Sequence, residues 1–229
     1  MPLVRLCAIW VVFACLPAFG TPLYEVFTGP VSAMVSAEAF PGVSEAQGTL
    51  KVTGIPAGAT VKAAYLYTSD WFSTAPLQAN FGSKDVGSSA PASTDGHFSN
   101  YRWDVTDAIN GNGDYTFDLN GGTQIYSVAL AIVYSLPGKP ERTITLTDFS
   151  QEVGAPDGYG ATAGTPEMNL HLVSPYSGAG TLWLLTNADD PETTGEGIYF
   201  NAAQVGGPID GKSGTLQQPV QIARGRPVR

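Results

Sequence analysis

Residues 125–148, IYSVALAIVYSLPGKPERTITLTD, decide the fold of this chain. The first ten residues are almost entirely apolar and rich in β-branched and aromatic side chains, and the run is too short to cross a bilayer as a helix. This pattern predicts a strand buried on both faces at the centre of the core. Two prolines and a glycine within residues 136–141 then turn the chain. Residues 142–148 alternate Ile144 and Leu146 with threonines, which predicts a half-buried strand that completes a β-hairpin or a corner.

The rest of the chain has the composition of an all-β protein. Its 229 residues include 27 Gly and 17 Pro, which divide the sequence into short apolar runs. Asp104 is expected to cap one short helix over residues 105–110 that Gly111 ends. The fold is therefore predicted to be a two-sheet antiparallel β-sandwich with a jelly-roll-like arrangement of about eleven strands. The expected strands are residues 31–37, 48–53, 60–68, 77–82, 97–105, 114–119, 125–134, 142–148, 168–173, 181–186 and 197–205.

The N-terminus has the features of a signal peptide. Arg5 precedes an apolar run at residues 6–16, and small residues at positions 18 and 20 suit signal peptidase, so residues 1–20 are predicted to be cleaved. The mature protein is then expected to be secreted, to the cell surface, the extracellular medium or a periplasm, without membrane insertion. Two alternatives remain open: a transmembrane anchor, which Pro17 and the short run disfavour, and a lipoprotein modified at Cys15.

Cysteine and charge restrict the chemistry and the partners. Cys7 and Cys15 both lie in the leader, so the mature domain is expected to have no disulfide. The formal charge is −9, and loss of Arg5 with the leader would lower it to −10, which disfavours nucleic acid and anionic lipid as partners. Residues 21–210 are predicted to form one domain. Residues 211–229, which carry four basic and no acidic side chains, are predicted to be a flexible basic tail.

Several short motifs along the predicted core strands suggest a family. They are AAYLY at 63–67, DVTD at 104–107, GNGDYT at 111–116, AIVY at 131–134, PERTI at 140–144, Leu146 and Asp148. In these motifs the chain resembles a family of secreted β-domains of unknown function that occur in bacterial and archaeal cell-surface and adhesin-like proteins. The similarity covers roughly residues 60–210. It implies a β-sandwich with a role in surface interaction, and it implies no catalytic residue.

The patterns that suggest catalysis are weak. Residues 206–213, GGPIDGKS, match a phosphate-binding loop, but Gly214 and Pro219 disfavour the helix that such a loop requires. Neither histidine, His97 or His171, lies near a recognisable nucleophile. A carboxylate pair could serve a secreted polysaccharide hydrolase, which stays an alternative. The acidic residues near predicted strand ends are Asp70, Asp104, Asp107, Asp148 and Glu152.

A calcium site is a second hypothesis. Asp104, Asp107, Asn110, Asn112 and Asp114 lie within eleven residues, and loop carboxylates suit the weak calcium sites of extracellular proteins. A structural calcium ion is therefore a candidate ligand of this loop, and no other cofactor is expected. The alternative is a solvated acidic loop in which Asp104 only caps the helix.

Aromatic residues in loops give the candidate ligand site. Trp71 and Phe72 follow Asp70 in a loop rich in hydroxyl groups, and Tyr159 stands in a glycine-rich segment. Exposed aromatic rings beside acids and hydroxyls are typical of sugar-binding surfaces. The alternative is that these rings cover the end of the core. The sequence as a whole favours a secreted, non-catalytic module that binds an extracellular glycan or protein. A structural coat or matrix component that assembles through exposed sheet edges is a further alternative.

Overall fold

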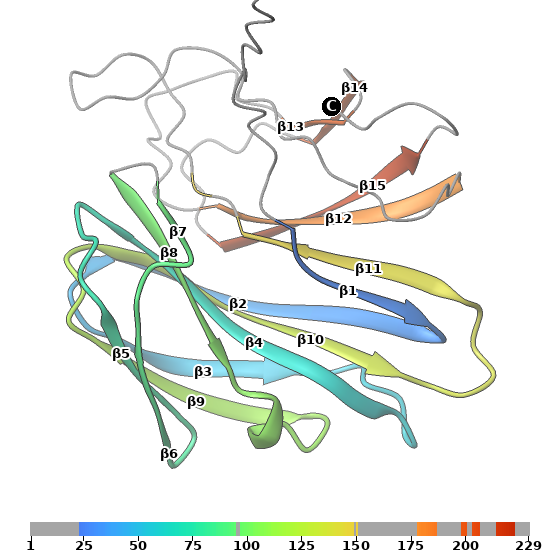
Figure 1. Ribbon diagram of the computed structural model, residues 1–229, viewed down its shortest axis with the longest axis horizontal. Coiled ribbons are helices and arrows are strands. Elements are labelled where there is room, and N and C mark those ends of the chain that lie inside the picture. Colours follow the sequence, from blue (N-terminus) through green and yellow to red (C-terminus); the bar gives the residue numbers. More distant parts are fainter. Residues whose placement is uncertain are drawn as a thin grey trace, which may run out of the picture.

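The computed structural model describes residues 23–94, 97–148, 150, 178–186, 198–200, 203–206 and 214–222. Two antiparallel sheets face each other across one core (Figure 1). This arrangement confirms the predicted all-β sandwich. The larger sheet contains, in order, β2 (Val31–Val43), β10 (Ile125–Ser135), β4 (Thr60–Trp71), β8 (Phe98–Asp104) and β7 (Ser93–Thr94). The smaller sheet contains β3 (Ala46–Val52), β9 (Gly113–Asn120), β5 (Leu77–Phe81) and β6 (Lys84–Ser89).

The path of the chain through the two sheets is that of a jelly roll. From β2 to β5 the strands alternate between the larger and the smaller sheet, β6 stays beside β5, and β8, β9 and β10 alternate again. The resulting orders, β2-β10-β4-β8 and β3-β9-β5-β6, are those of an eight-stranded jelly roll built from two Greek keys. The predicted jelly-roll-like arrangement is therefore confirmed.

Strand β10 is the centre of the larger sheet, as its sequence predicts. It pairs with β2 on one side and with β4 on the other. Leu130 and Ile132 point into the core between the sheets and are fully buried, while Ala129 and Val133 on the opposite face are 3% and 1% exposed. Burial on both faces explains the nearly continuous apolar run.

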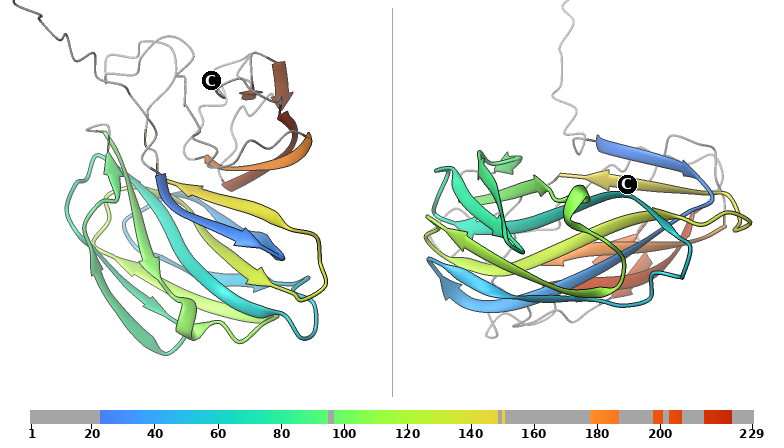
Figure 2. Two further views of the ribbon diagram at one scale, coloured as in Figure 1. Left: turned by 45° about the vertical axis from the view of Figure 1, so that its right-hand side comes forward. Right: turned by 90° about the horizontal axis from the view of Figure 1, so that it is seen from below.

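The chain turns a corner after β10 rather than forming a hairpin. Strand β11 (Arg142–Thr147) pairs with β1 (Leu23–Gly29), and this two-stranded ribbon lies over the outer face of the larger sheet (Figures 1 and 2). A second ribbon, β12 (Gly178–Thr186) with β15 (Gly214–Ile222), contacts the same sheet at β2 and β10. The short strands β13 (Ile198–Phe200) and β14 (Ala203–Gly206) pair with each other.

The predicted short helix is present as a single 3-10 turn. It spans Thr106–Ala108, and the Oδ1 atom of Asp104 accepts a hydrogen bond of 2.9 Å from the amide of Thr106. The turn is shorter than expected because Val105, Thr106 and Ile109 are β-branched residues that favour extended backbone. In the described parts of the chain, no helix has the length and apolar character needed to span a bilayer.

The prediction of a flexible tail from residue 211 is wrong for residues 214–222, which form β15. Pro219 is tolerated there because β15 bonds to β12 along one edge only, among the described strands. The strand expected at 197–205 is instead the pair β13 and β14. The strand expected at 168–173 and the remaining basic tail, 223–229, lie outside the described residues.

Candidate ligand-binding site

Aromatic side chains gather at one end of the larger sheet, where β4 ends and β8 and β10 begin. The Trp71 ring stacks on Phe72, with ring centroids 4.3 Å apart, and on its cross-strand neighbour Phe98 at 5.9 Å. Tyr126 lies 6.4 Å from Trp71, and His97 lies 5.9 Å from Phe72. Trp71, Phe72 and Phe98 therefore form a continuous stack, which we call the aromatic platform.

Phe72 holds an unusual backbone conformation. Its φ angle is 62°, and within the described ranges it is the one residue other than glycine with positive φ. Neighbouring side chains on a strand point to opposite faces, so the left-handed conformation is what lets Phe72 fold back over Trp71. Such a conformation costs about 1–3 kcal/mol. Burial does not offset this cost fully, because the Phe72 side chain is 45% exposed.

Hydrogen bonds from neighbouring elements fix the platform. The Phe72 amide donates to the carbonyl of His97 at 2.8 Å, and the Trp71 amide donates to the carbonyl of Gln124 at 3.1 Å. From below, the hydroxyl of the fully buried Tyr101 donates to the carbonyl of Ala75 at 2.7 Å. The loop that carries Phe72 is thus held on both sides before any ligand binds.

Asp70 lies beneath the platform and is fully buried. Its carboxylate accepts hydrogen bonds from the amides of Thr123, at 2.9 Å, and Gln124, at 2.5 Å. Burial raises the pKa of the Asp70 carboxyl, and the amides of Gln124 and Thr123 oppose that rise. Of the four predicted ligand residues, Trp71 and Phe72 are in the platform and Asp70 positions the adjacent turn. Tyr159 lies outside the described residues.

The predicted calcium residues are spread along the η1–β9 loop and have different partners. Asp104 accepts the Thr106 amide, and Asp114 lies on β9 opposite Lys51. Asn112 bridges to the loop before β4: its Oδ1 accepts from the Ile55 amide at 2.8 Å, and its Nδ2 donates to the Ile55 carbonyl at 2.9 Å. No group of three or more His, Cys, Asp or Glu side chains able to hold a metal occurs in the described residues. The calcium site stays a prediction.

Pairing across the larger sheet creates a polar cluster that the sequence analysis missed. Arg102 of β8 forms an ion pair with Asp148, just after β11, and its guanidinium lies 3.1 Å from the ring centroid of Tyr24 on β1. Burial raises the pKa of the nearby Tyr67 to about 12, and Arg102 opposes that rise. The cluster fixes the β1–β11 ribbon on the sheet. Glu152, His171 and residues 207–213 lie outside the described residues.

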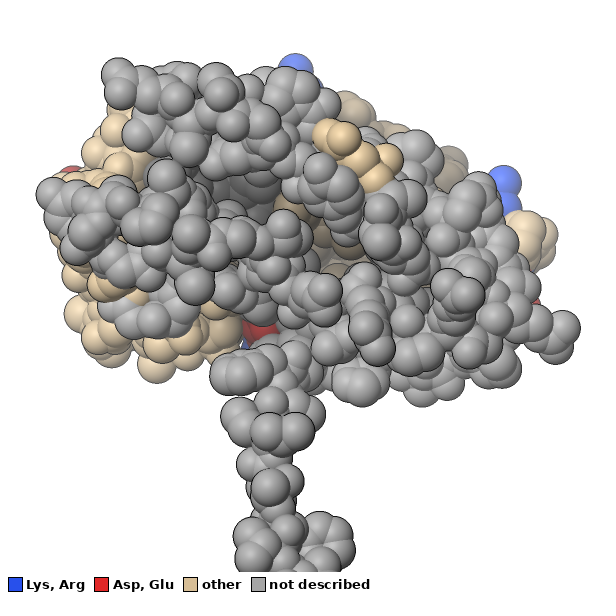
Figure 3. Space-filling view, turned by 90° about the horizontal axis from the view of Figure 1, so that it is seen from above, with Lys and Arg blue, Asp and Glu red and all other residues tan. Residues whose placement is uncertain are grey.

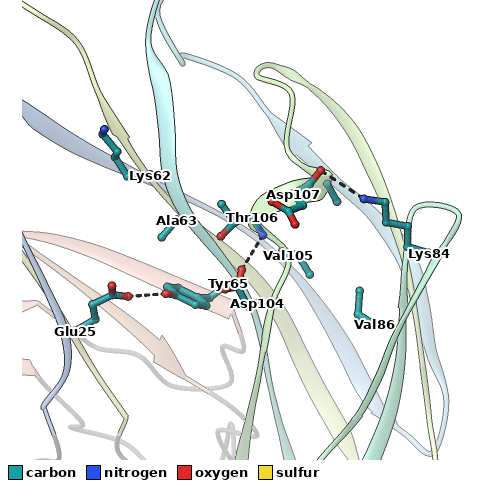
Figure 4. A pocket seen from close by; sticks show the side chains of 11 residues that line it. Glu25, Lys62, Ala63, Tyr65, Lys84, Val86, Asp104, Val105, Thr106 and Asp107 are labelled. Atoms are coloured by element: carbon teal, nitrogen blue, oxygen red, sulfur yellow. Dashed lines mark hydrogen bonds between the residues drawn. The ribbon is translucent and has the colours of Figure 1, made fainter.

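A groove of about 490 Å³ lies at the other end of the sheet, beside η1 (Figure 4). Its lining carries both signs of charge, from Lys62, Lys84 and Asp104 among others. Figure 4 shows Lys84 reaching towards Asp107. The Nζ atom of Lys84 donates a hydrogen bond of 3.5 Å to the backbone carbonyl of Asp107. Tyr65 donates to Glu25 in the wall, and burial together with this bond raises the pKa of Tyr65.

Comparison with known proteins gives no further guide to function. The chain matches no family model, no curated protein and no solved structure. The resemblance to secreted cell-surface β-domains therefore stays a prediction.

Proposed function

We propose that this protein is a secreted, non-catalytic binding module whose aromatic platform stacks against a sugar ring of an extracellular glycan. The observation that carries the proposal is Phe72: a large apolar side chain, nearly half exposed, in a strained backbone conformation. Strain of this kind persists only where the surrounding structure enforces it, and it concentrates at functional sites. A ring that served the core alone would be expected to be buried.

The chemistry of the platform fits a sugar. The C–H face of a pyranose ring packs against the π-face of an aromatic ring, while hydroxyl groups at its edge need hydrogen-bonding partners. The residues flanking Phe72 and the turn held by Asp70 supply hydroxyl and amide groups. These are Ser73, Thr74, Thr123 and Gln124.

The hydrogen bonds beneath the platform support binding without a large rearrangement. Because the Phe72 loop and the 121–124 turn are already tied to His97, to Tyr101 and to Asp70, a ligand would not have to order them. Preorganisation of this kind lowers the entropic cost of association. The leader at residues 1–20 supports an extracellular role.

The contacts of the acidic residues favour binding over hydrolysis. Asp70, Asp104 and Asp148, which could each belong to a catalytic pair, bond to backbone amides or to Arg102. A glycosidase needs one carboxyl group as acid and a second as nucleophile or base, placed on either side of the scissile bond. None of these three carboxylates borders the platform as a free group.

The proposal is tested by measuring oligosaccharide binding to residues 21–229 and to two variants, Phe72→Ala and Phe72→Gly. Either substitution removes the stacking face, so affinity should fall about tenfold or more. Glycine accepts φ of 62° without strain, so Phe72→Gly should keep the wild-type stability or exceed it by up to about 1 kcal/mol.

Lys62→Ala, in the groove at the other end of the sheet, is the control and should leave affinity unchanged. The proposal fails if Phe72→Gly binds as tightly as the wild type. It also fails if that variant loses several kcal/mol of stability, since the ring would then be part of the core.

A further inference from the structure

Three Asn-Gly pairs lie in the η1–β9 loop and at the end of β9: Asn110-Gly111, Asn112-Gly113 and Asn120-Gly121. At such a pair the backbone nitrogen of the glycine can attack the side-chain carbonyl carbon of the asparagine. Glycine favours this attack because it has no Cβ atom to obstruct the approach and its backbone adopts many conformations. The same dipeptide thus stands in three different settings, and those settings determine which pair reacts.

The first pair, Asn110-Gly111, is open. Asn110 is exposed in the loop between η1 and β9, and within the described parts of the chain its side-chain amide makes no hydrogen bond. The backbone amide of Gly111 likewise has no acceptor among the described residues. A Cβ atom at Gly111 would meet nothing within 4 Å, so the space beside this amide is free. Both reacting atoms, the Gly111 nitrogen and Cγ of Asn110, are therefore accessible.

The other two pairs are held by hydrogen bonds. Asn112 accepts from the Ile55 amide at 2.8 Å and donates to the Ile55 carbonyl at 2.9 Å, so its Cγ cannot turn towards Gly113 unless both bonds break. Asn120 is half-buried at the end of β9, and its Nδ2 atom donates to Oδ1 of Asp118 at 2.9 Å. The reactivity of the three pairs in the folded protein should therefore fall in the order Asn110, Asn120, Asn112.

The reactive loop lies at the end of the sandwich away from the aromatic platform. Trp71 is the last residue of β4 and Phe98 the first of β8, whereas η1 follows the end of β8. The η1 coil is at the bottom of the molecule in Figure 1 and faces the reader in the view from below in Figure 2, whereas Figure 3 shows the opposite side, from above. A reaction at Asn110 therefore leaves the platform untouched, and this inference is independent of the proposed function.

We propose that Asn110 is a site of spontaneous deamidation in the folded protein. The Gly111 nitrogen gives its proton to solvent and bonds to Cγ of Asn110, the Cγ–Nδ2 bond breaks, and ammonia leaves. Water then opens the resulting cyclic imide at either carbonyl, which gives aspartate or isoaspartate at this position. The net reaction consumes one water, releases one ammonia and changes no oxidation state. The new carboxylate takes the formal charge of residues 21–229 from −10 to −11.

Tyr115 restrains the reacting pair and is released by the reaction. Its hydroxyl accepts from the Asn110 amide at 3.1 Å and donates to the Gly111 carbonyl at 2.9 Å, so it spans the two residues. The backbone must turn between these two groups to bring the nitrogen to Cγ, and the Tyr115 bonds oppose that turn. An isoaspartate adds one carbon atom to the backbone between the same two groups, so the hydroxyl can no longer bond to both in the original geometry.

Timed incubation of residues 21–229 at 37 °C and neutral pH tests the proposal, with peptide mass mapping and isoaspartyl-methyltransferase labelling as readouts. Asn110 should be modified about tenfold or more faster than Asn112, whose side chain must first give up two hydrogen bonds. The rate at Asn120 should lie between them. In concentrated urea the three rates should converge, because each Asn-Gly pair is then equally unrestrained.

Two variants complete the test. Asn110→Gln should abolish the modification in this peptide, because the longer side chain cyclises far more slowly. Tyr115→Phe keeps the ring that stacks on Phe81, 5.8 Å away, but removes both hydroxyl bonds, so it should raise the rate at Asn110 about threefold or more.

Three results would count against the inference. Asn110 that stays unmodified in the folded protein, or Asn112 that reacts as fast as Asn110, would overturn the proposed site. An unchanged rate at Asn110 in Tyr115→Phe would overturn the restraint by Tyr115.

Discussion

At the scale of single residues, close packing at the seam between the two sheets determines which side chains are allowed. Gly48 lies on edge strand β3, and a Cβ atom there would lie 2.8 Å from Cζ of Phe117 and would overlap the carboxylate of Glu38. That carboxylate also accepts the amide of Thr49, 3.2 Å away, so it cannot move without losing the bond. Glu38 thus covers part of the open edge of β3.

Gly48→Ala should therefore destabilise the protein by about 1–3 kcal/mol through overpacking. Gly113→Ala is the matched control, because a Cβ atom at that strand position would meet the Tyr115 ring at an ordinary 3.7 Å. Urea denaturation of both variants checks the prediction. A Gly48→Ala variant as stable as Gly113→Ala would show that Glu38 and Phe117 can move aside without cost.

At the scale of elements, loops are joined by side chains that imitate backbone pairing. The Asn112 side chain bonds to both the amide and the carbonyl of Ile55, which connects the η1–β9 loop to the loop before β4. Asn112→Ala should cost about 1–3 kcal/mol, because it leaves partly buried backbone groups of Ile55 without their partners.

The control for this substitution is Asn110→Ala, in the same loop, where the exposed side chain has no comparable bridge and the cost should be within about 0.5 kcal/mol. Thermal unfolding with calcium and with EDTA gives a second reading. If Asn112 binds calcium instead, its substitution should remove a calcium-dependent rise in the melting temperature that the wild type shows.

Strands that have a clear apolar pattern could be predicted from the sequence, and strands without one could not. β10 and β4 could be predicted because their apolar runs reflect local burial, but β6, with the sequence KDVGSS, has no apolar period and is held by its pairing with β5. The Trp71–Phe72 pair could be identified as a candidate site because of its loop-like neighbours. The contribution of Phe98 could not, because it depends on a register between strands distant in sequence.

The partners of buried polar side chains could not be predicted from the sequence either. The sequence predicts Asp70 as a ligand residue because it adjoins Trp71, yet its carboxylate accepts hydrogen bonds from amides more than fifty residues away. Similarly, nothing local predicts that Arg102, Asp148 and Tyr24 meet. Contacts of this kind depend on which strands pair and in which register. The alternation of apolar and polar residues along a single strand does not determine that pairing.

At the scale of the whole molecule, the half-buried Tyr67 on the outer face of the larger sheet makes stability depend on alkaline pH. The pKa of Tyr67 is raised from 10.0 to about 12 in the folded protein, so the fold favours the neutral phenol. Above pH 10 the unfolded chain releases this proton first, and the free energy of unfolding therefore falls between about pH 10 and 12.

Tyr67→Phe should flatten this part of the stability profile, because the variant has no phenol to titrate at that position. Denaturation at a series of pH values from 8 to 12 measures the slope in both proteins. Identical slopes would mean that Tyr67 ionises equally in the folded and unfolded states, and thus that the cluster around Arg102 is open to water.

The proposed contact between the aromatic platform and a glycan is tested most directly by a two-dimensional ¹H–¹⁵N NMR titration with a neutral hexose oligosaccharide. We expect chemical-shift changes to concentrate on the Trp71 indole and on the amides of Phe72, Ser73, Thr123 and Gln124, the residues around the platform. Changes confined to the groove beside η1, or to the outer face of the smaller sheet, would contradict the account.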